Sequence, residues 1–100
     1  MKSLRIKRTA KAEEDLIAIW CYIAADNEGA ADRLLDRLDR RWELLSTQPH
    51  SGMSRSDIGD GVRYVVVGEY LTFYRVDAGD IAILRIIHGR RDIRSEDVVE

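Results

Sequence analysis

The sequence predicts an α+β domain of order β-α-α-β-β-β, in which an N-terminal helical hairpin packs on one face of a small antiparallel sheet. The first half of the chain contains two segments whose apolar residues recur at spacings of three and four. The second half contains three runs rich in β-branched and aromatic residues, joined by connections too short for parallel crossovers. One hundred residues with a single proline fit one domain of this size, residues 1–100.

The chain begins with a short strand and a helix. "LRIK", residues 4–7, alternates apolar and basic side chains, which is typical of a half-buried strand. Thr9 can then cap a helix over about residues 10–25, because its hydroxyl can accept from a free amide of the first turn. The expected buried face of this helix carries Ala12, Leu16, Ile19, Trp20 and Ile23.

The second helix has the clearest amphipathic pattern in the chain, and Pro49 lies just beyond its end. About five residues separate it from the first helix, so the two form a helical hairpin. We expect Trp20 and Trp42 in its core. The apolar positions of this helix are Ala31, Leu34, Leu35, Leu38, Trp42 and Leu45.

A polar loop over residues 50–61 leads into three strands, "VRYVVV", "EYLTFYRV" and "IAILRIIH". Gly68 and the turn "DAGD" connect them, so they form an antiparallel meander. The last two strands are apolar on both sides, whereas a sheet with one solvated face alternates apolar and polar residues. In the last strand, one predicted side carries Ala82, Leu84 and Ile86, and the other carries Ile81, Ile83, Arg85 and Ile87. In the strand before it, one side carries Leu71 and Phe73, and the other carries Tyr70, Tyr74 and Val76.

The helical hairpin can cover only one face of this sheet. A partner protein, a second copy or the C-terminal tail could cover the other, and we favour a partner because large exposed apolar patches mark interfaces.

Composition limits the function. The net charge of −2 gives no general attraction to nucleic acid, and we expect no sequence-specific DNA binding by this chain alone. The single cysteine, Cys21, rules out an intrachain disulfide, and neither histidine has zinc ligands at the usual spacing, so we expect no metal and no cofactor. With no secretory signal and no apolar run of about 20 residues, the sequence predicts a cytoplasmic protein without a membrane partner.

Four stretches, "AEEDLIAIWCYIA", "QPHSG", "EYLTFYRV" and "IAILRIIHGRRD", together resemble the ParE branch of the ParE/RelE toxin superfamily. The resemblance implies the toxin of a type II toxin–antitoxin system with a plasmid-stabilising role. Its ParD-like antitoxin would wrap the toxin with a C-terminal segment, commonly in a heterotetramer. The antitoxin is expected to cover the sheet at Tyr70, Phe73, Tyr74, Ile81, Ile83, Arg85 and Ile87.

The superfamily contains two mechanisms. RelE-like toxins cut messenger RNA on the ribosome, and here Leu71 stands where they carry an arginine, while Arg91 matches their second basic residue. If the chain were such a ribonuclease, Arg85, His88 and Arg91 would be its catalytic residues. ParE-like toxins instead inhibit DNA gyrase, which requires a binding surface and no catalytic residues. We therefore expect a gyrase inhibitor and no enzyme, with a ribonuclease or a non-toxic binding module as alternatives.

The expected target-binding residues lie at the end of the last strand: Arg85, His88, Arg90, Arg91 and Asp92. An ion pair of Arg90 or Arg91 with Asp92 or Glu96 is the structural alternative for the two arginines. One departure from the family pattern is Met53, which follows Gly52 where ParE-like sequences often carry arginine; here the arginine is displaced to Arg55.

Overall fold

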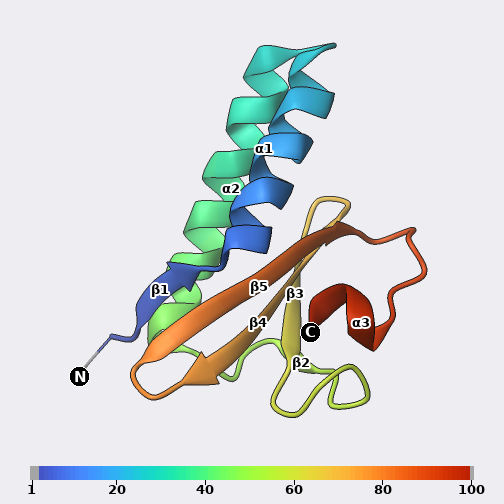
Figure 1. Ribbon diagram of the computed structural model, residues 1–100. Helices are drawn as coiled ribbons and strands as arrows, with labels where there is room; N and C mark the ends of the chain where they lie inside the picture. The colour runs from blue at the N-terminus through green and yellow to red at the C-terminus, as the bar shows by residue number, and fades with distance from the viewer. Residues whose placement is uncertain (1–2, 100) are drawn as a thin grey trace.

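The computed structural model describes residues 3–99, and it confirms the α+β fold and the N-terminal helical hairpin (Figure 1). The helices α1 and α2 lie side by side on one face of a five-stranded sheet and project beyond its end (Figure 1). The sheet order is β1-β5-β4-β3-β2. The elements are β1 (Arg5–Arg8), α1 (Ala10–Ala24), α2 (Glu28–Thr47), β2 (Met53–Ser54), β3 (Arg63–Val67), β4 (Tyr70–Asp77), β5 (Asp80–His88) and α3 (Ser95–Val98).

The sheet is mixed, which corrects the prediction of an antiparallel one. Strand β1 pairs in parallel with β5, with Arg5 opposite Asp80 and Arg8 opposite Ile83, whereas β2–β3, β3–β4 and β4–β5 are antiparallel. The partner of β1 follows it by some 75 residues, so no local pattern in the sequence could specify the direction of pairing. Strand β2 is a two-residue addition from the predicted polar loop.

Side-chain caps fix where both long helices begin. The Thr9 hydroxyl accepts a hydrogen bond from the Ala12 amide at 3.1 Å, as predicted, and it also donates to the Leu84 carbonyl at 3.1 Å. Asn27 caps α2 by accepting from the Ala30 amide at 3.0 Å. The Thr9 contact joins the start of α1 to β5, so one residue both starts the helix and positions it on the sheet.

The main core lies between the helical hairpin and the sheet. Trp42 is buried, and its indole N–H donates to the hydroxyl of Thr72, also buried, at 3.1 Å. Trp20 is only half-buried, because its indole reaches the Asp32 carboxylate at 2.8 Å near the surface. The prediction of two core tryptophans is therefore confirmed for Trp42 and too strong for Trp20.

The C-terminal tail and the loop before β3 cover part of the second face of the sheet. Helix α3 places Val98 in a second buried cluster with Ile58, Val62, Phe73 and Ile87. We had favoured a partner as the cover of this face, and the structure corrects this in part, because the chain itself covers some of it. The apolar residues of the tail, Ile93, Val98 and Val99, stand among five polar or charged ones without a clear period, which concealed their role in the sequence.

A bulge in β5 corrects the predicted faces of this strand. Phe73 lies opposite Arg85 and Tyr74 opposite Ile83, so Leu84 is the extra residue and the alternation changes phase there. As a result Ile86 joins Ile81 and Ile83 in the core below the hairpin, whereas Ile87 belongs to the second cluster. The predicted faces of β4 are confirmed.

Candidate functional site

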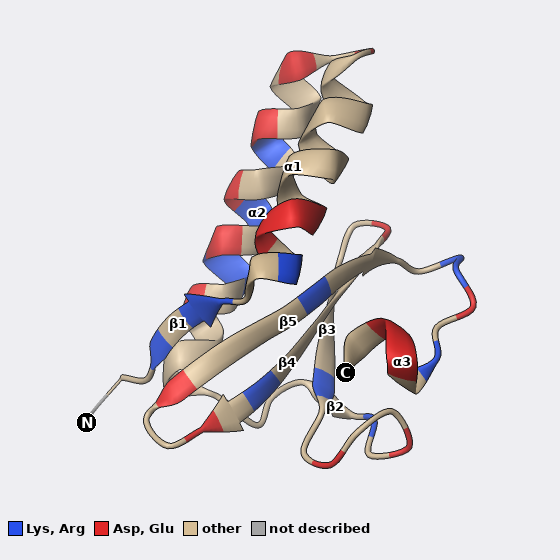
Figure 2. Cartoon of the chain, viewed as in Figure 1, with Lys and Arg blue, Asp and Glu red and all other residues tan. Residues whose placement is uncertain are grey.

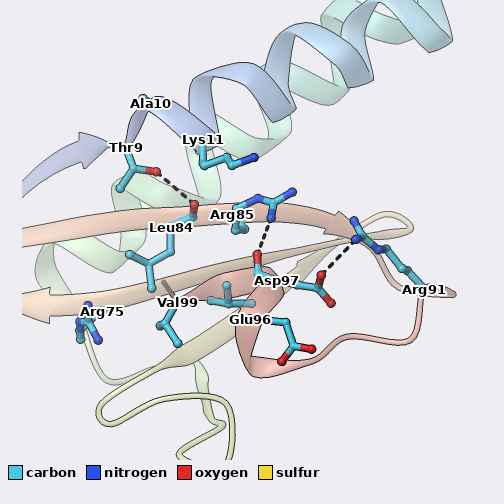
Figure 3. Close-up of a pocket in the computed structure, with 11 residues that line it drawn as sticks. Thr9, Ala10, Lys11, Arg75, Leu84, Arg85, Arg91, Glu96, Asp97 and Val99 are labelled. Carbon is cyan, nitrogen blue, oxygen red and sulfur yellow. Dashed lines mark hydrogen bonds and ion pairs between the residues drawn. The ribbon is translucent and has the colours of Figure 1, made fainter.

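A cleft of about 740 Å³ lies between the start of α1, the middle of β5 and the C-terminal helix α3 (Figure 3). Two of the predicted site residues, Arg85 and Arg91, line it. The other lining residues are Thr9, Ala10, Lys11, Arg75, Leu84, Glu96, Asp97, Val98 and Val99.

Arg85 is held at the centre of this region by a bidentate ion pair with Asp15 of α1. Its Nε lies 2.7 Å from Oδ2 of Asp15 and its Nη2 lies 3.0 Å from Oδ1. Oδ2 also accepts from the Ile86 amide at 3.0 Å, and the Arg85 Nη1 donates to the Asp97 carbonyl. The hydrogen bond to Asp15 raises the pKa of Arg85 above its ordinary value. With only 14% of its side chain exposed, Arg85 ties α1, β5 and α3 together.

The Asp97 side chain is the second anchor of the tail. Its Oδ1 pairs with Nη2 of Arg91 at 3.2 Å (Figure 3). Its Oδ2 accepts from the Arg94 amide at 2.9 Å. The ion-pair alternative for Arg91 named Asp92 or Glu96, and the structure corrects the partner to Asp97. Arg91 therefore fastens α3 beside the exit of β5.

His88 lies apart from the cleft that contains Arg85 and Arg91. Its ring packs edge-on against Tyr70, with centroids 5.3 Å apart, and its Nε2 is 3.7 Å from the Glu69 carboxylate. Its Nδ1 accepts from the Arg90 amide at 3.1 Å. His88 lines a separate shallow groove at the β3–β4 turn. The structure thus does not bring the three candidate ribonuclease residues into one site.

The remaining target-binding candidates lie on the exposed turn between β5 and α3. Arg90, Arg91 and Asp92 are exposed, and the Asp92 carboxylate is 3.9 Å from the Arg94 guanidinium. Basic residues precede and follow Asp92 in this turn (Figure 2). Of the five candidates, only Arg85 is largely withdrawn from the surface.

The predicted antitoxin-binding residues are mostly interior, which corrects the expectation that they form an exposed surface. Tyr70 and Arg85 are half-buried, and the other five pack inside the chain, either under the hairpin or in the cluster that the tail and the loop before β3 form on the other face. These five are Phe73, Tyr74, Ile81, Ile83 and Ile87.

Exposed apolar side chains occur elsewhere. Ile17 and Tyr22 on α1, Leu44 on α2, Met53 on β2 and Val66 on β3 are each more than half exposed. Sequence reasoning missed them as surface residues. For the helical residues, position along the helix could have identified them. Ile17 and Tyr22 fall outside the predicted buried face of α1, and Leu44 falls outside that of α2.

Within residues 3–99, no three His, Cys, Asp or Glu side chains lie close enough together to hold a metal ion. In the same range, no helix is both long enough and apolar enough to cross a membrane.

Comparison with known proteins gives consistent results. Residues 6–93 match the family described as the ParE toxin of the type II toxin–antitoxin system, parDE. Toxin ParE3 of Caulobacter vibrioides is 30% identical over 93 residues, which cover 92% of this chain and 93% of the relative. A chain from the chromosomal ParDE system of P. aeruginosa superposes with a TM-score of 0.71 at 26% identity, covering 86% of this chain and 96% of its own. A chain of the RelBE2 toxin–antitoxin complex from Mycobacterium tuberculosis shares the fold, with a TM-score of 0.57 at 22% identity over 86% of this chain and 98% of its own.

Proposed function

The chain belongs to the ParE toxin family of type II toxin–antitoxin systems, and on this premise we propose that it binds and inhibits DNA gyrase and is neutralised by a ParD-like antitoxin. Inhibition of gyrase would stop replication and growth. The site of action would be the cytoplasm, and on a plasmid such a toxin would favour retention of the plasmid.

One observation favours binding over RNA cleavage: the candidate ribonuclease residues do not converge. Arg85 is committed to Asp15, and His88 lies with Tyr70 and Glu69 in another groove. Leu71, at the position where RelE-like toxins carry arginine, cannot hold a phosphate. Cleavage requires a base near the attacking hydroxyl and cations near the scissile phosphate in one site.

We assign the target-binding surface to the exposed end of β5 and the turn that follows it. Arg90, Arg91 and Asp92 present charged side chains there, and His88 lies at its edge. Arg85 has a supporting role, because its contacts with Asp15 and Asp97 hold the elements on either side of the turn. Charged surfaces of this kind give specificity and fast association.

The antitoxin would bind the outside of the folded toxin, since the hairpin covers one face of the sheet and the chain also covers part of the other. The exposed apolar side chains on α1, α2 and β3 supply the surface that such a partner would bury. A complex of two toxin and two antitoxin chains is the expected assembly.

Growth assays with charge reversal test this function. Expression of the chain alone should arrest growth, and co-expression of the small gene next to its own should restore it. The double variant Arg90→Glu/Arg91→Glu should lose the arrest while still binding the antitoxin. The control is Arg5→Glu/Arg33→Glu, which reverses two exposed arginines away from this turn.

Two results would contradict the proposal. Undiminished arrest by the Arg90–Arg91 variant would remove this turn from the target-binding surface. Normal growth on expression of the unmodified chain would favour a non-toxic binding module.

A further inference from the structure

The turn that carries Arg90 and Arg91 projects beyond the sheet between β5 and α3 (Figure 1). Both arginines are exposed, and their backbone is held by His88, the last residue of β5. The His88 carbonyl accepts a hydrogen bond from the Arg91 amide at 3.1 Å. The His88 ring accepts another through Nδ1 from the Arg90 amide, also at 3.1 Å. One residue thus binds the backbone amides of both arginines.

The His88 ring is itself held in place by the start of β4. Tyr70 lies opposite His88 in the sheet, and the two rings meet edge-on with centroids 5.3 Å apart. The backbones are joined at the same point, since the Gly89 amide donates to the Glu69 carbonyl at 2.8 Å. Only 37% of the His88 side chain is exposed. The ring therefore meets the Arg90 amide from a packed position.

The contact between His88 and Arg90 requires one protonation state of the ring. A ring nitrogen accepts a hydrogen bond only when it carries no proton, so the proton of the neutral ring is on Nε2. Imidazole gains a second proton in mildly acidic solution. Nδ1 then becomes a donor and faces the Arg90 N–H, which is also a donor. Proton uptake therefore removes this hydrogen bond.

The charged and titratable groups around the ring do not replace the lost contact. The Glu69 carboxylate attracts the doubly protonated ring, but it is 71% exposed and 3.7 Å from Nε2, so this pair contributes little. Burial raises the pKa of Tyr70, and the nearby Tyr22 of α1 and Glu69 raise it further, so Tyr70 stays neutral over the same range. Arg90 adds positive charge to the turn, which does not favour a second proton on the ring.

We propose that His88 is a positioning residue of the target-binding surface, whose neutral ring holds Arg90 and Arg91 in the geometry that the target recognises; the identity of the target rests on the proposed function. Proton uptake by the ring would loosen the turn and weaken binding of the target. The toxin would therefore bind its target more tightly at neutral pH than in mild acid.

Two substitutions separate the acceptor atom from the ring. His88→Leu keeps an apolar side chain beside Tyr70 and removes the acceptor. His88→Asn removes the ring and keeps an acceptor, because the side-chain oxygen of asparagine commonly accepts from the amide two residues further along the chain. The asparagine amide does not titrate. His88→Asn should therefore restore the hold on Arg90 without its dependence on pH.

Affinity for purified gyrase is the first readout. At about pH 7.5, His88→Leu should bind about 5-fold more weakly than the unmodified chain, the factor that corresponds to one hydrogen bond of typical net strength, and His88→Asn should recover most of this loss. Between about pH 7.5 and about pH 5.5, the unmodified chain should lose about 5-fold in affinity relative to His88→Asn. Comparison at the same pH cancels the response of gyrase itself. Antitoxin binding by each variant is the control for folding.

Nuclear magnetic resonance of the free chain gives a second readout, which does not depend on the target. The nitrogen shifts of the His88 ring should place the proton of the neutral ring on Nε2. The protection of the Arg90 amide against exchange should fall as the ring takes up its second proton. The Gly89 amide is the matched control, because its acceptor is the Glu69 carbonyl and its protection should persist.

The outcomes separate this inference from the proposed function. Equal gyrase affinities of His88→Leu and the unmodified chain would overturn the inference, and so would the same pH dependence in His88→Asn as in the unmodified chain. Should His88→Leu fail to fold, the comparison of His88→Asn with the unmodified chain across pH decides alone. If the unmodified chain does not bind gyrase while Arg90 protection follows the protonation of His88, the proposed target is wrong and the hold of His88 on the turn stands.

Discussion

Loss of the Asp15 carboxylate should destabilise the domain more than any loss of a surface charge. Asp15 accepts three hydrogen bonds, two from the Arg85 guanidinium and one from the Ile86 amide. In Asp15→Asn the Arg85 charge would remain largely buried without a carboxylate. We therefore expect the free energy of unfolding to fall.

The magnitude follows from the burial of the pair. Removal of one partner of a buried ion pair costs about 3–5 kcal/mol. The side chains of Arg85 and Asp15 keep 14% and 15% of their surface exposed, which places the expected loss at the lower end, about 3 kcal/mol. For a domain of this size, that corresponds to a fall in Tm of roughly 12–24 °C.

Urea and thermal unfolding followed by circular dichroism measure this loss. The matched control is Asp57→Asn, because Asp57 forms a bidentate pair with Arg55 at 2.9 and 3.0 Å but on the exposed surface. Exposed pairs of this kind contribute little, so its unfolding should barely change. Equal losses from Asp15→Asn and Asp57→Asn would refute the central role of the Asp15–Arg85 pair.

Three further substitutions test the packing. Trp42→Ala should cost about 3–5 kcal/mol by urea unfolding, since it leaves a cavity and strips the Thr72 hydroxyl of its partner; a loss below about 1 kcal/mol would contradict the assigned core. Tyr74→Phe should cost about 1–3 kcal/mol, because the Tyr74 hydroxyl accepts from the Gly52 amide and donates to a backbone carbonyl. Burial raises the pKa of Tyr74 in the folded protein. The protonated hydroxyl therefore contributes fully to the stability below the pKa of the unfolded chain, about 10, and this contribution is lost as the pH rises through the pKa of the folded protein. As the pH rises from neutral to above about 10, Tyr74→Phe should therefore lose less stability than the unmodified chain. Equal losses of unfolding free energy in the two proteins would contradict the burial of this hydroxyl. Val98→Asp should release the tail and speed amide exchange in residues 95–99 while the hairpin core stays protected; unchanged exchange in the tail would contradict its assigned contacts.

The sequence was sufficient for features that depend on neighbours along the chain. The periodicity of α2 and the cap at Thr9 both reflect local geometry, so the range of α1 was predicted to within one residue and most of the apolar face of α2 was predicted. The same holds for the faces of β4, whose side chains point to the two sides of the sheet in strict alternation because the extra residue of the bulge lies in β5.

Features that depend on contacts between residues far apart in the chain could not be predicted from the sequence. The bulge at Leu84 changes the phase of β5, although nothing in "IAILRIIH" marks it. Arg85 was assigned to binding because its partner Asp15 lies 70 residues away in the sequence. The tail was underestimated because Val98 lies among charged residues, where its burial depends on the far face of the sheet.

The most direct test of the account incubates the free toxin with gyrase and supercoiled DNA, and in parallel with translating ribosomes. Inhibition of gyrase predicts linear DNA trapped after protein digestion and intact messenger RNA, with no linear DNA from the Arg90→Glu/Arg91→Glu variant. Messenger RNA cut in the ribosomal A site, with the DNA unaffected, would contradict the account and assign catalytic roles to Arg85, His88 and Arg91.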